Sequence, residues 1–234
     1  MKSLKILESR AYTPYSGSPQ YAVVKGKSGN YYPGVRVENV SYPLSITAVQ
    51  AALYGCISES DIPVEIILPE GDSEFLIDYW KSHFSLKISH TFPEESELTN
   101  YILQPGNELR KDLEKLLERA SVSESNFPVA CILETEKGWV TGVNIEVGSW
   151  PLGLCAERVA ISKAVASGAG QILAAHVTAP KSDYVSPCGA CRQVLFEHLM
   201  SKRVYLYQND GGYFDVTAEQ LLPYHFKGDV LKKF

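Results

Sequence analysis

The chain has 234 residues, of which 45% are apolar and 21% charged, the balance of an ordinary globular protein with one large or two small domains. Its net charge of −5 gives nucleic acid no general attraction, because phosphate backbones call for a basic face. The first residues lack the apolar run of a signal peptide, and no stretch approaches the ~18 apolar residues of a membrane span. We therefore expect a cytoplasmic protein with reduced thiols that binds neither nucleic acid nor membranes.

The first half of the chain predicts a short series of strands and helices. Its apolar runs either flank turn residues or recur at helical spacing. In chain order these predict a hairpin, a helix, a buried strand and a second helix, over residues 19–39, 46–56, 64–68 and 73–83. Strands that alternate with helices indicate a layered α/β fold.

The second half predicts the same series after one additional helix. A break at Pro105-Gly106 precedes a charged amphipathic helix over residues 108–120, for which Asn107 is the expected N-cap. The following hairpin, helix, strand and helix are predicted over residues 127–147, 155–168, 171–179 and 190–200, and Gly168 is expected to end the first of these helices.

The two series are related by an internal sequence repeat. Residues 34–47 and 142–155 share Gly, Val, Glu, Ser, Pro and Leu in register, at an offset of 108 residues. The offset is 109 upstream, where Ser18-Pro19 matches Phe127-Pro128, and 118 downstream, where Pro69 matches Pro187. The repeat predicts two duplicated domains, over residues 1–106 and 107–234.

Three of the five cysteines have the spacing of a metal site. Cys155 precedes one predicted helix, while Cys188 and Cys191 begin another, and residues 156–187 leave room for the two motifs to meet. Helix N-termini stabilise thiolates, and three thiolates with an open fourth position are typical of a catalytic zinc that activates water. The spacing therefore predicts one Zn²⁺, with Cys155, Cys188 and Cys191 as its ligands.

Three charged residues next to these cysteines could serve the same site. Glu157 lies two residues beyond Cys155, so it can sit beside the metal and shuttle protons as general acid and base. Arg158 and Arg192 each follow a motif residue, and we expect them to donate hydrogen bonds to the sulfurs and draw charge from them.

These motifs resemble those of the cytidine deaminase family. The resemblance rests on CAER at 155–158, SPCGACRQVL at 186–195 and LLPYHF at 221–226, and on the zinc-deaminase signature of three ligands and one glutamate. It implies tandem three-layer α-β-α domains with a mixed central sheet, and a homodimer of two-domain chains. It also implies hydrolytic deamination of cytidine and 2′-deoxycytidine in pyrimidine salvage, with zinc in the second domain.

The resemblance further implies which residues bind the nucleoside. Asn144 and Glu146 match the family's residues for the ribose hydroxyls, and Phe127 matches the ring that lies against the pyrimidine. Val147 and Trp150 depart from the usual family residues, and the family's Tyr-Ser before the Phe is replaced by Ser123-Glu124. These departures leave the sugar preference open.

The first copy has lost the residues of the predicted site. Thr47 and Val49 stand against Cys155 and Glu157, Arg36 stands against Asn144, and Glu70 and Ser73 stand against the remaining two cysteines. We expect this copy to be a structural and interface element.

Two alternatives stay open. A related zinc deaminase could act on another nucleoside-like substrate, such as a blasticidin-type antibiotic or a modified nucleoside. A zinc-binding assembly protein could use the same fold without catalysis, although the retained Glu157 argues against a purely structural site.

Overall fold

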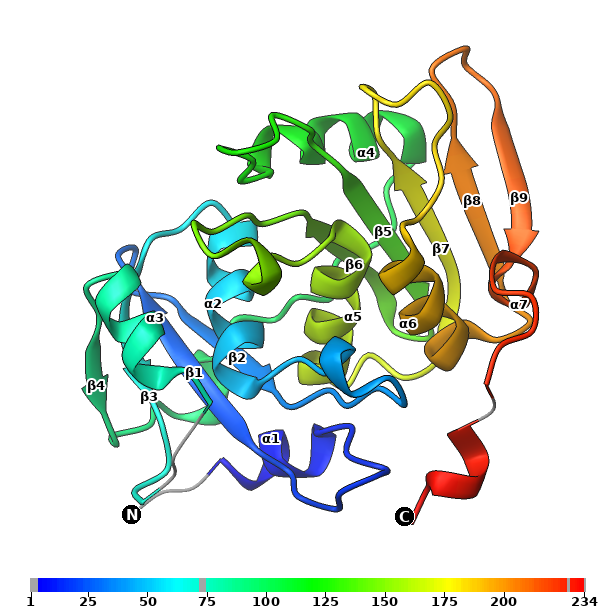
Figure 1. The fold of residues 1–234 in the computed structure, drawn as a ribbon. Coiled ribbons are helices and arrows are strands. Elements are labelled where there is room, and N and C mark those ends of the chain that lie inside the picture. The colour runs from blue at the N-terminus through cyan, green and yellow to red at the C-terminus, as the bar shows by residue number, and fades with distance from the viewer. Residues whose placement is uncertain (1–3, 72–74, 227, 234) are drawn as a thin grey trace.

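The computed structural model describes residues 4–71, 75–226 and 228–233, and it contains one mixed β-sheet in each half of the chain (Figure 1). The first sheet has the strand order β2 (Tyr31–Val35), β1 (Tyr21–Gly26), β3 (Pro63–Ile67), β4 (Lys87–Ser89). The second has the order β6 (Gly138–Val143), β5 (Ala130–Thr135), β7 (Ile172–Thr178), β8 (Arg203–Tyr207), β9 (Tyr213–Thr217).

The two sheets share one topology. In each, an antiparallel hairpin pairs antiparallel with a third strand, which pairs in parallel with a fourth. Even the register shift at the end of the central strand recurs, between Lys25 and Gly26 and between Glu134 and Thr135. The second sheet adds only β9. The predicted duplication and the mixed α/β class are therefore confirmed.

Five of the seven α-helices in the described residues match predicted helices, whereas the first and the last were not predicted. The seven are α1 (Lys5–Arg10), α2 (Ala48–Ser58), α3 (Ile77–His83), α4 (Leu109–Leu116), α5 (Ala156–Ser167), α6 (Gly189–Leu199) and α7 (Ala218–Leu221). Gly168 ends α5 in a left-handed conformation with φ +60, as expected, because this backbone region suits glycine. Residues 73 and 74 of the predicted helix over 73–83 lie outside the described residues. Within the described part of the chain, none of the helices could bridge a bilayer.

The predicted cap of the helix after the break is wrong. This helix, α4, begins at Leu109, so that Glu108 occupies the cap position, with no hydrogen bond from its side chain to the first turn. Asn107 lies one residue too early to accept from the N–H groups that a cap satisfies. The helix also ends earlier, and Leu117–Arg119 continue it as a 3₁₀ turn.

The second half has three layers. A Cβ on Gly142 of β6 would lie 2.3 Å from the Ala156 carbonyl oxygen and 2.4 Å from the Ala160 nitrogen, so α5 rests directly on this face of the sheet. The strand pairing places Tyr207 on the opposite face, where Arg110 of α4 lies over its ring at 5.0 Å. The predicted α-β-α layering is confirmed here.

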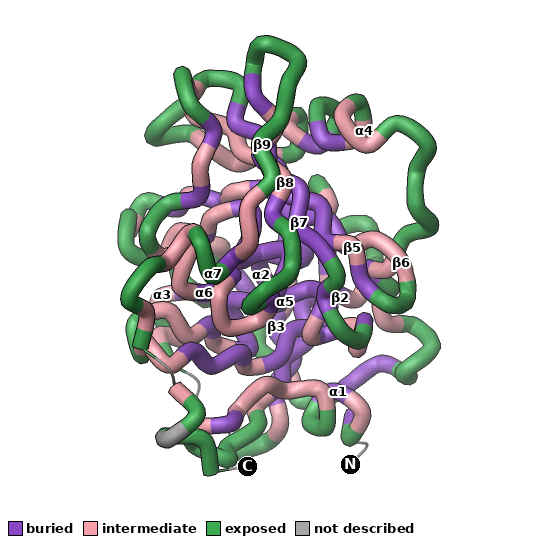
Figure 2. Tube along the Cα trace, turned by 90° about the vertical axis from the view of Figure 1, so that its right-hand side faces the viewer, coloured by how far each residue is buried: buried purple, intermediate pink, exposed green. Residues whose placement is uncertain are grey.

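Helices α2 and α5 form the centre of the molecule. Ten of the eleven residues of α2 and ten of the twelve of α5 are buried, which requires packing on every side rather than on one stripe. The two helices pack against each other between the sheets, and burial concentrates there in Figure 2.

Two mirrored hydrogen bonds relate the halves. Gln50 on α2 donates to the Leu152 carbonyl at 2.7 Å. Its counterpart on α5, Arg158, donates to the Leu44 carbonyl at 3.0 Å. Both donors and both acceptors are related by the offset of 108, so the two copies pair as two subunits would across a twofold axis.

A buried ion pair joins the C-terminal end of α2 to the C-terminal half of α5. The Lys163 ammonium on α5 is 1% exposed and lies 2.6 Å from Glu59, the residue that ends α2. Arg119 contacts the other oxygen of Glu59 at 3.1 Å. This cluster fixes the second half against the first, because a buried ammonium must keep its partner.

Candidate metal centre and active site

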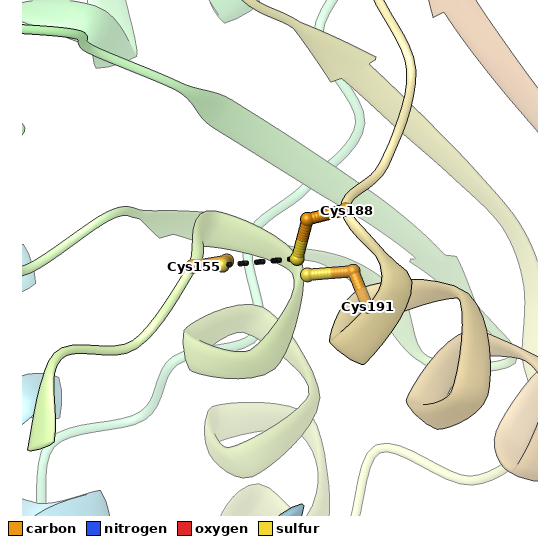
Figure 3. Close-up of side chains that lie close together, drawn as sticks. All are labelled: Cys155, Cys188 and Cys191. Carbon is orange, nitrogen blue, oxygen red and sulfur yellow. Dashed lines mark hydrogen bonds between the residues drawn. The ribbon is translucent and has the colours of Figure 1, made fainter. Parts of the chain in front are cut away.

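The three cysteines of the predicted metal site converge from the starts of two helices (Figure 3). Cys155 is the N-cap residue of α5, and Cys188 is the N-cap residue of α6, both with extended backbone. Cys191 lies in the first turn of α6. Gly142 lets the start of α5 lie close to β6, and it therefore also helps to position Cys155, the residue that precedes α5.

The sulfur atoms have the separations that a zinc ion needs. All three lie within 4.8 Å of one another, and the Sγ atoms of Cys155 and Cys188 are 3.6 Å apart. Tetrahedral coordination at about 2.3 Å per Zn–S bond places two sulfurs about 3.8 Å apart. The donor set therefore fits zinc.

Hydrogen bonds among the three thiols stabilise one negative charge, on Cys188. Thiol donors from Cys155 and Cys191, with backbone N–H groups of the first turn of α6, lower the pKa of Cys188. The pKa of Cys155 is raised first by its hydrogen bond to Cys188, and the pKa of Cys191 is raised first by its hydrogen bond to Cys155 and then by its hydrogen bond to Cys188. A divalent cation would replace these protons and stabilise all three thiolates.

Glu157 lies buried beside this cluster. It sits in the first turn of α5, is 2% exposed, and its Oε2 has no hydrogen-bond partner in the described part of the protein. Burial, followed by the charge of Cys188, raises its pKa to about 7. A carboxyl group with such a pKa both accepts and releases protons near neutrality, as acid and base catalysis requires.

The segment with Asn144 and Glu146 runs alongside the metal centre. Between them, Ile145 exchanges two backbone hydrogen bonds with Leu154, the residue before Cys155, at 2.9 and 3.0 Å. The Asn144 side chain accepts from the Val129 N–H at 2.8 Å and donates to the Phe127 carbonyl at 2.9 Å. Asn144 thereby holds the strand entry that carries Phe127, whose half-buried ring packs on the core.

Sequence reasoning missed Ser125, which organises the same loop. The Glu146 carboxylate accepts from the N–H groups of Glu124 and Ser125, both at 3.0 Å, and from the Ser125 hydroxyl. Glu38 makes the same bonds to Tyr15 and Ser16 in the first copy.

This pairing corrects the sequence assignment of the loop before Phe127. The internal repeat at offset 109 places Glu124-Ser125, not Ser123-Glu124, opposite Tyr15-Ser16. The repeat could have identified Ser125, since Ser16 and Ser125 both lie two residues before the Ser18 and Phe127 that were matched.

The two arginines do not bond to the sulfurs as expected. Arg158 reaches across to Leu44 in the first half, and its Nε has no hydrogen-bond partner among the described residues. Arg192 donates to the Pro187 carbonyl and the Ser186 hydroxyl, both at 2.9 Å. Arg192 therefore braces the loop that carries Cys188 rather than its sulfur.

The first copy keeps the local fold of this region without its chemistry. Thr47 is the N-cap of α2, and its hydroxyl accepts from the Gln50 N–H at 3.2 Å. Val49 is buried where the second copy has Glu157. Within the described residues the three cysteines form the one cluster suited to a metal, and Ser73 lies outside those residues.

Comparisons with known proteins match both halves of the chain to one family. A family model described as the cytidine and deoxycytidylate deaminase zinc-binding region matches residues 107–207, and a second model of that description matches residues 5–68. The cytidine deaminases of Mycoplasma genitalium and Sporosarcina psychrophila are each 40% identical to the chain. The matches span 121 and 129 residues, covering 50% and 51% of this chain and 92% and 95% of those proteins.

Among solved structures, the cytidine deaminase from Burkholderia pseudomallei is 34% identical, covers 50% of this chain and 94% of that one, and gives a TM-score of 0.47. The two curated relatives each match about half of this chain. With both copies matched by family models, the chain belongs to the cytidine and deoxycytidylate deaminase family.

Proposed function

We propose that the protein hydrolyses cytidine and 2′-deoxycytidine to uridine and 2′-deoxyuridine, with release of ammonia. The observation that carries this proposal is the buried carboxylate of Glu157 beside three convergent cysteines, with one oxygen that has no hydrogen-bond partner among the described residues. The relatives named above are cytidine deaminases, which supports cytidine over blasticidin-type and modified nucleosides.

The proposed mechanism divides the work between the metal and the protein. One zinc ion per chain, held by Cys155, Cys188 and Cys191, would polarise a water molecule for attack on C4 of the cytosine ring. Glu157 takes a proton from that water, delivers it to N3 of the ring and then transfers a proton to the departing amino group.

The remaining site residues orient the nucleoside. Glu146 and Asn144 lie where the chain passes the metal centre, and we assign them to the ribose hydroxyls. Phe127 is assigned to the pyrimidine ring. The hydrogen bonds that Asn144 and Glu146 make to their own loop hold these groups in place before substrate binds.

The organisation of the chain completes the proposal. Residues 107–234 form the catalytic domain, and residues 1–106 form a non-catalytic domain of the same fold. We propose that two such chains associate as a homodimer and act in pyrimidine salvage in the cytoplasm.

The direct test is the change in ultraviolet absorbance as cytosine becomes uracil. Zinc-loaded protein should convert cytidine and 2′-deoxycytidine, and Glu157→Gln should reduce kcat by roughly 10²- to 10⁴-fold while zinc stays bound. Protein that binds zinc but converts neither nucleoside would refute the substrate assignment. A panel of modified nucleosides and blasticidin-type compounds would then be assayed.

A further inference from the structure

A cavity of about 330 Å³ lies in the first copy at the counterpart of the metal centre. Its lining includes Arg36 and Thr47, which occupy the repeat positions of Asn144 and Cys155. The second half closes it with Leu152 and Arg158. The first copy has thus lost the metal ligands but kept a hollow of a size that small-molecule sites commonly have.

The charged side chains that the described residues contribute to the lining of this cavity are positive. Arg36 and Arg158 are the charged side chains among the described residues that line it, in a chain whose net charge is −5. The N-terminus of α2, with Thr47 and Gln50 in the lining, adds the positive end of a helix dipole. An anionic ligand therefore matches the cavity.

The two arginines retain capacity for such a ligand. Arg158 is 8% exposed, no carboxylate lies within ion-pair distance among the described residues, and its Nε lacks a hydrogen-bond partner. Arg36 forms an ion pair with Glu38 at 3.1 Å and donates to Gln20, which also lines the cavity, at 3.3 Å. Glu38 is 4% exposed and does not line the cavity, so it orients the guanidinium without blocking it.

The mouth of the cavity carries an exposed ring. Tyr42 lines it with 80% of its surface exposed, in the 3₁₀ turn η1 (Tyr42–Leu44). An exposed tyrosine next to cations is suited to stack on a planar group that carries a negative charge.

We propose that this cavity binds a small anion carried on a planar ring, of the size of a pyrimidine nucleoside 5′-phosphate. The anion contacts Arg36 and Arg158 near the start of α2, and the ring lies against Tyr42. This goes beyond the proposed deamination, and it does not depend on which nucleoside the second copy converts.

Isothermal titration calorimetry on the zinc-loaded full chain tests the site. The probes are uridine 5′-monophosphate, uridine and orthophosphate. The monophosphate should bind most tightly, and Arg36→Gln should weaken it at least roughly tenfold, because charge-assisted hydrogen bonds to phosphate are lost. Arg203→Gln is the matched control, since Arg203 pairs with Asp215 on the exposed edge strands. It should leave binding unchanged.

A second variant guards against misfolding of the first. Tyr42→Ala changes an exposed ring, and it should weaken the monophosphate severalfold while leaving orthophosphate unaffected. Cytidine turnover, measured on the same samples, tests the proposed deamination independently of nucleotide binding to the cavity.

Three results would overturn the proposal. The first is no binding of the monophosphate, and the second is binding that neither variant alters. The third is binding of orthophosphate as tight as that of the monophosphate, or equally tight binding of uridine that Arg36→Gln also weakens.

Discussion

The N-cap residues of α2 and α5 have the same backbone conformation but different side chains. Thr47 caps α2 with φ −74 and ψ 157, and Cys155 caps α5 with φ −68 and ψ 159. The threonine hydroxyl satisfies its own helix, whereas the cysteine sulfur points to Cys188 on another helix. A fold can therefore keep the geometry of a site after its chemistry is gone, because helix packing on the sheet sets that geometry.

The carboxylates of Glu38 and Glu146 extend this comparison. Each accepts the same two backbone N–H groups and one serine hydroxyl from the loop before the first strand of its copy. Glu38 is present in the copy that lacks the metal ligands. A glutamate at this position is therefore explained by its hydrogen bonds to the loop, without any role in catalysis. The assigned ribose contact of Glu146 adds to a structural role that both copies need.

The largest expected contrast is between Cys155→Ser and Thr47→Ser. The first should abolish zinc binding and lower cytidine turnover by roughly a thousandfold or more, since several kcal/mol of metal catalysis are lost. The second keeps the cap hydroxyl, so zinc content and turnover should match those of the unaltered protein. Metal analysis of both variants checks this. Zinc retained by Cys155→Ser, or two zinc ions in the unaltered chain, would contradict a single site.

The ion pair that joins the copies gives the next largest effect. Glu59→Ala strands the buried Lys163 ammonium and should reduce the free energy of unfolding by about 3 kcal/mol. Lys163→Met removes the buried charge itself and should cost less.

The control for this pair is Asp215→Ala. It breaks the exposed pair with Arg203 and should cost under about 1 kcal/mol. Urea denaturation gives the free energy of unfolding of all three variants. Equal decreases for Glu59→Ala and Asp215→Ala would show that the ion pair between the copies stabilises the protein no more than an exposed pair does.

Equivalent glycines test whether the two copies pack equally tightly. A Cβ on Gly34 would lie 2.2 Å from the Ala52 nitrogen, and one on Gly142 would lie 2.3 Å from the Ala156 carbonyl oxygen. Gly34→Ala and Gly142→Ala should each cost roughly 2–3 kcal/mol, because helix and strand must separate. Gly148→Ala, with its nearest neighbour at 3.9 Å, is the unstrained control. A much smaller cost at Gly34 would mean that the first copy has loosened.

The smallest expected effect concerns the pH dependence of the free energy of unfolding, to which α6 contributes a histidine at a position where α3 has a tryptophan. The downstream offset of 118 places His198 of α6 opposite Trp80 of α3. Burial, with a smaller contribution from Lys232, lowers the pKa of His198 to about 4, below the value of about 6.5 of an unfolded chain.

The unfolded state therefore binds the proton first as the pH falls. This contribution of His198 is complete above pH 6.5 and is lost as the pH falls toward 4, by about 2 kcal/mol between pH 7 and pH 5. His198→Gln should flatten that part of the stability profile. An unchanged slope in urea unfolding at the two pH values would rule out His198 as its source.

The sequence was informative wherever a local pattern decides the structure. Apolar periodicity predicted α2, α5, β3 and β7 within about two residues, and Gly168 predicted the end of α5. The cap of α4 failed because Asn107 and Glu108 are both polar, and which one takes the cap depends on how the helix docks on the sheet. The cysteine cluster was predictable because its spacing and the helix starts constrain each other.

What the sequence could not predict was contact between distant residues. Arg158 was expected to serve the sulfurs, but its guanidinium spans the junction to Leu44. Nothing in the local sequence distinguishes these outcomes, since both place an arginine after Glu157. The internal repeat pointed to the observed contact, because it aligns Arg158 with Gln50, and the hydrogen bond from Gln50 to Leu152 is the counterpart of the one from Arg158 to Leu44.

The mirrored bonds of Gln50 and Arg158 have a consequence for how the molecule behaves on dilution. Two copies that meet as separate chains are held together only as long as their concentration exceeds their dissociation constant. Here the covalent link keeps each copy at a fixed, high effective concentration near the other. Pairing of the halves is therefore independent of how much protein is present, and one copy can lose its catalytic residues while it still supports its partner.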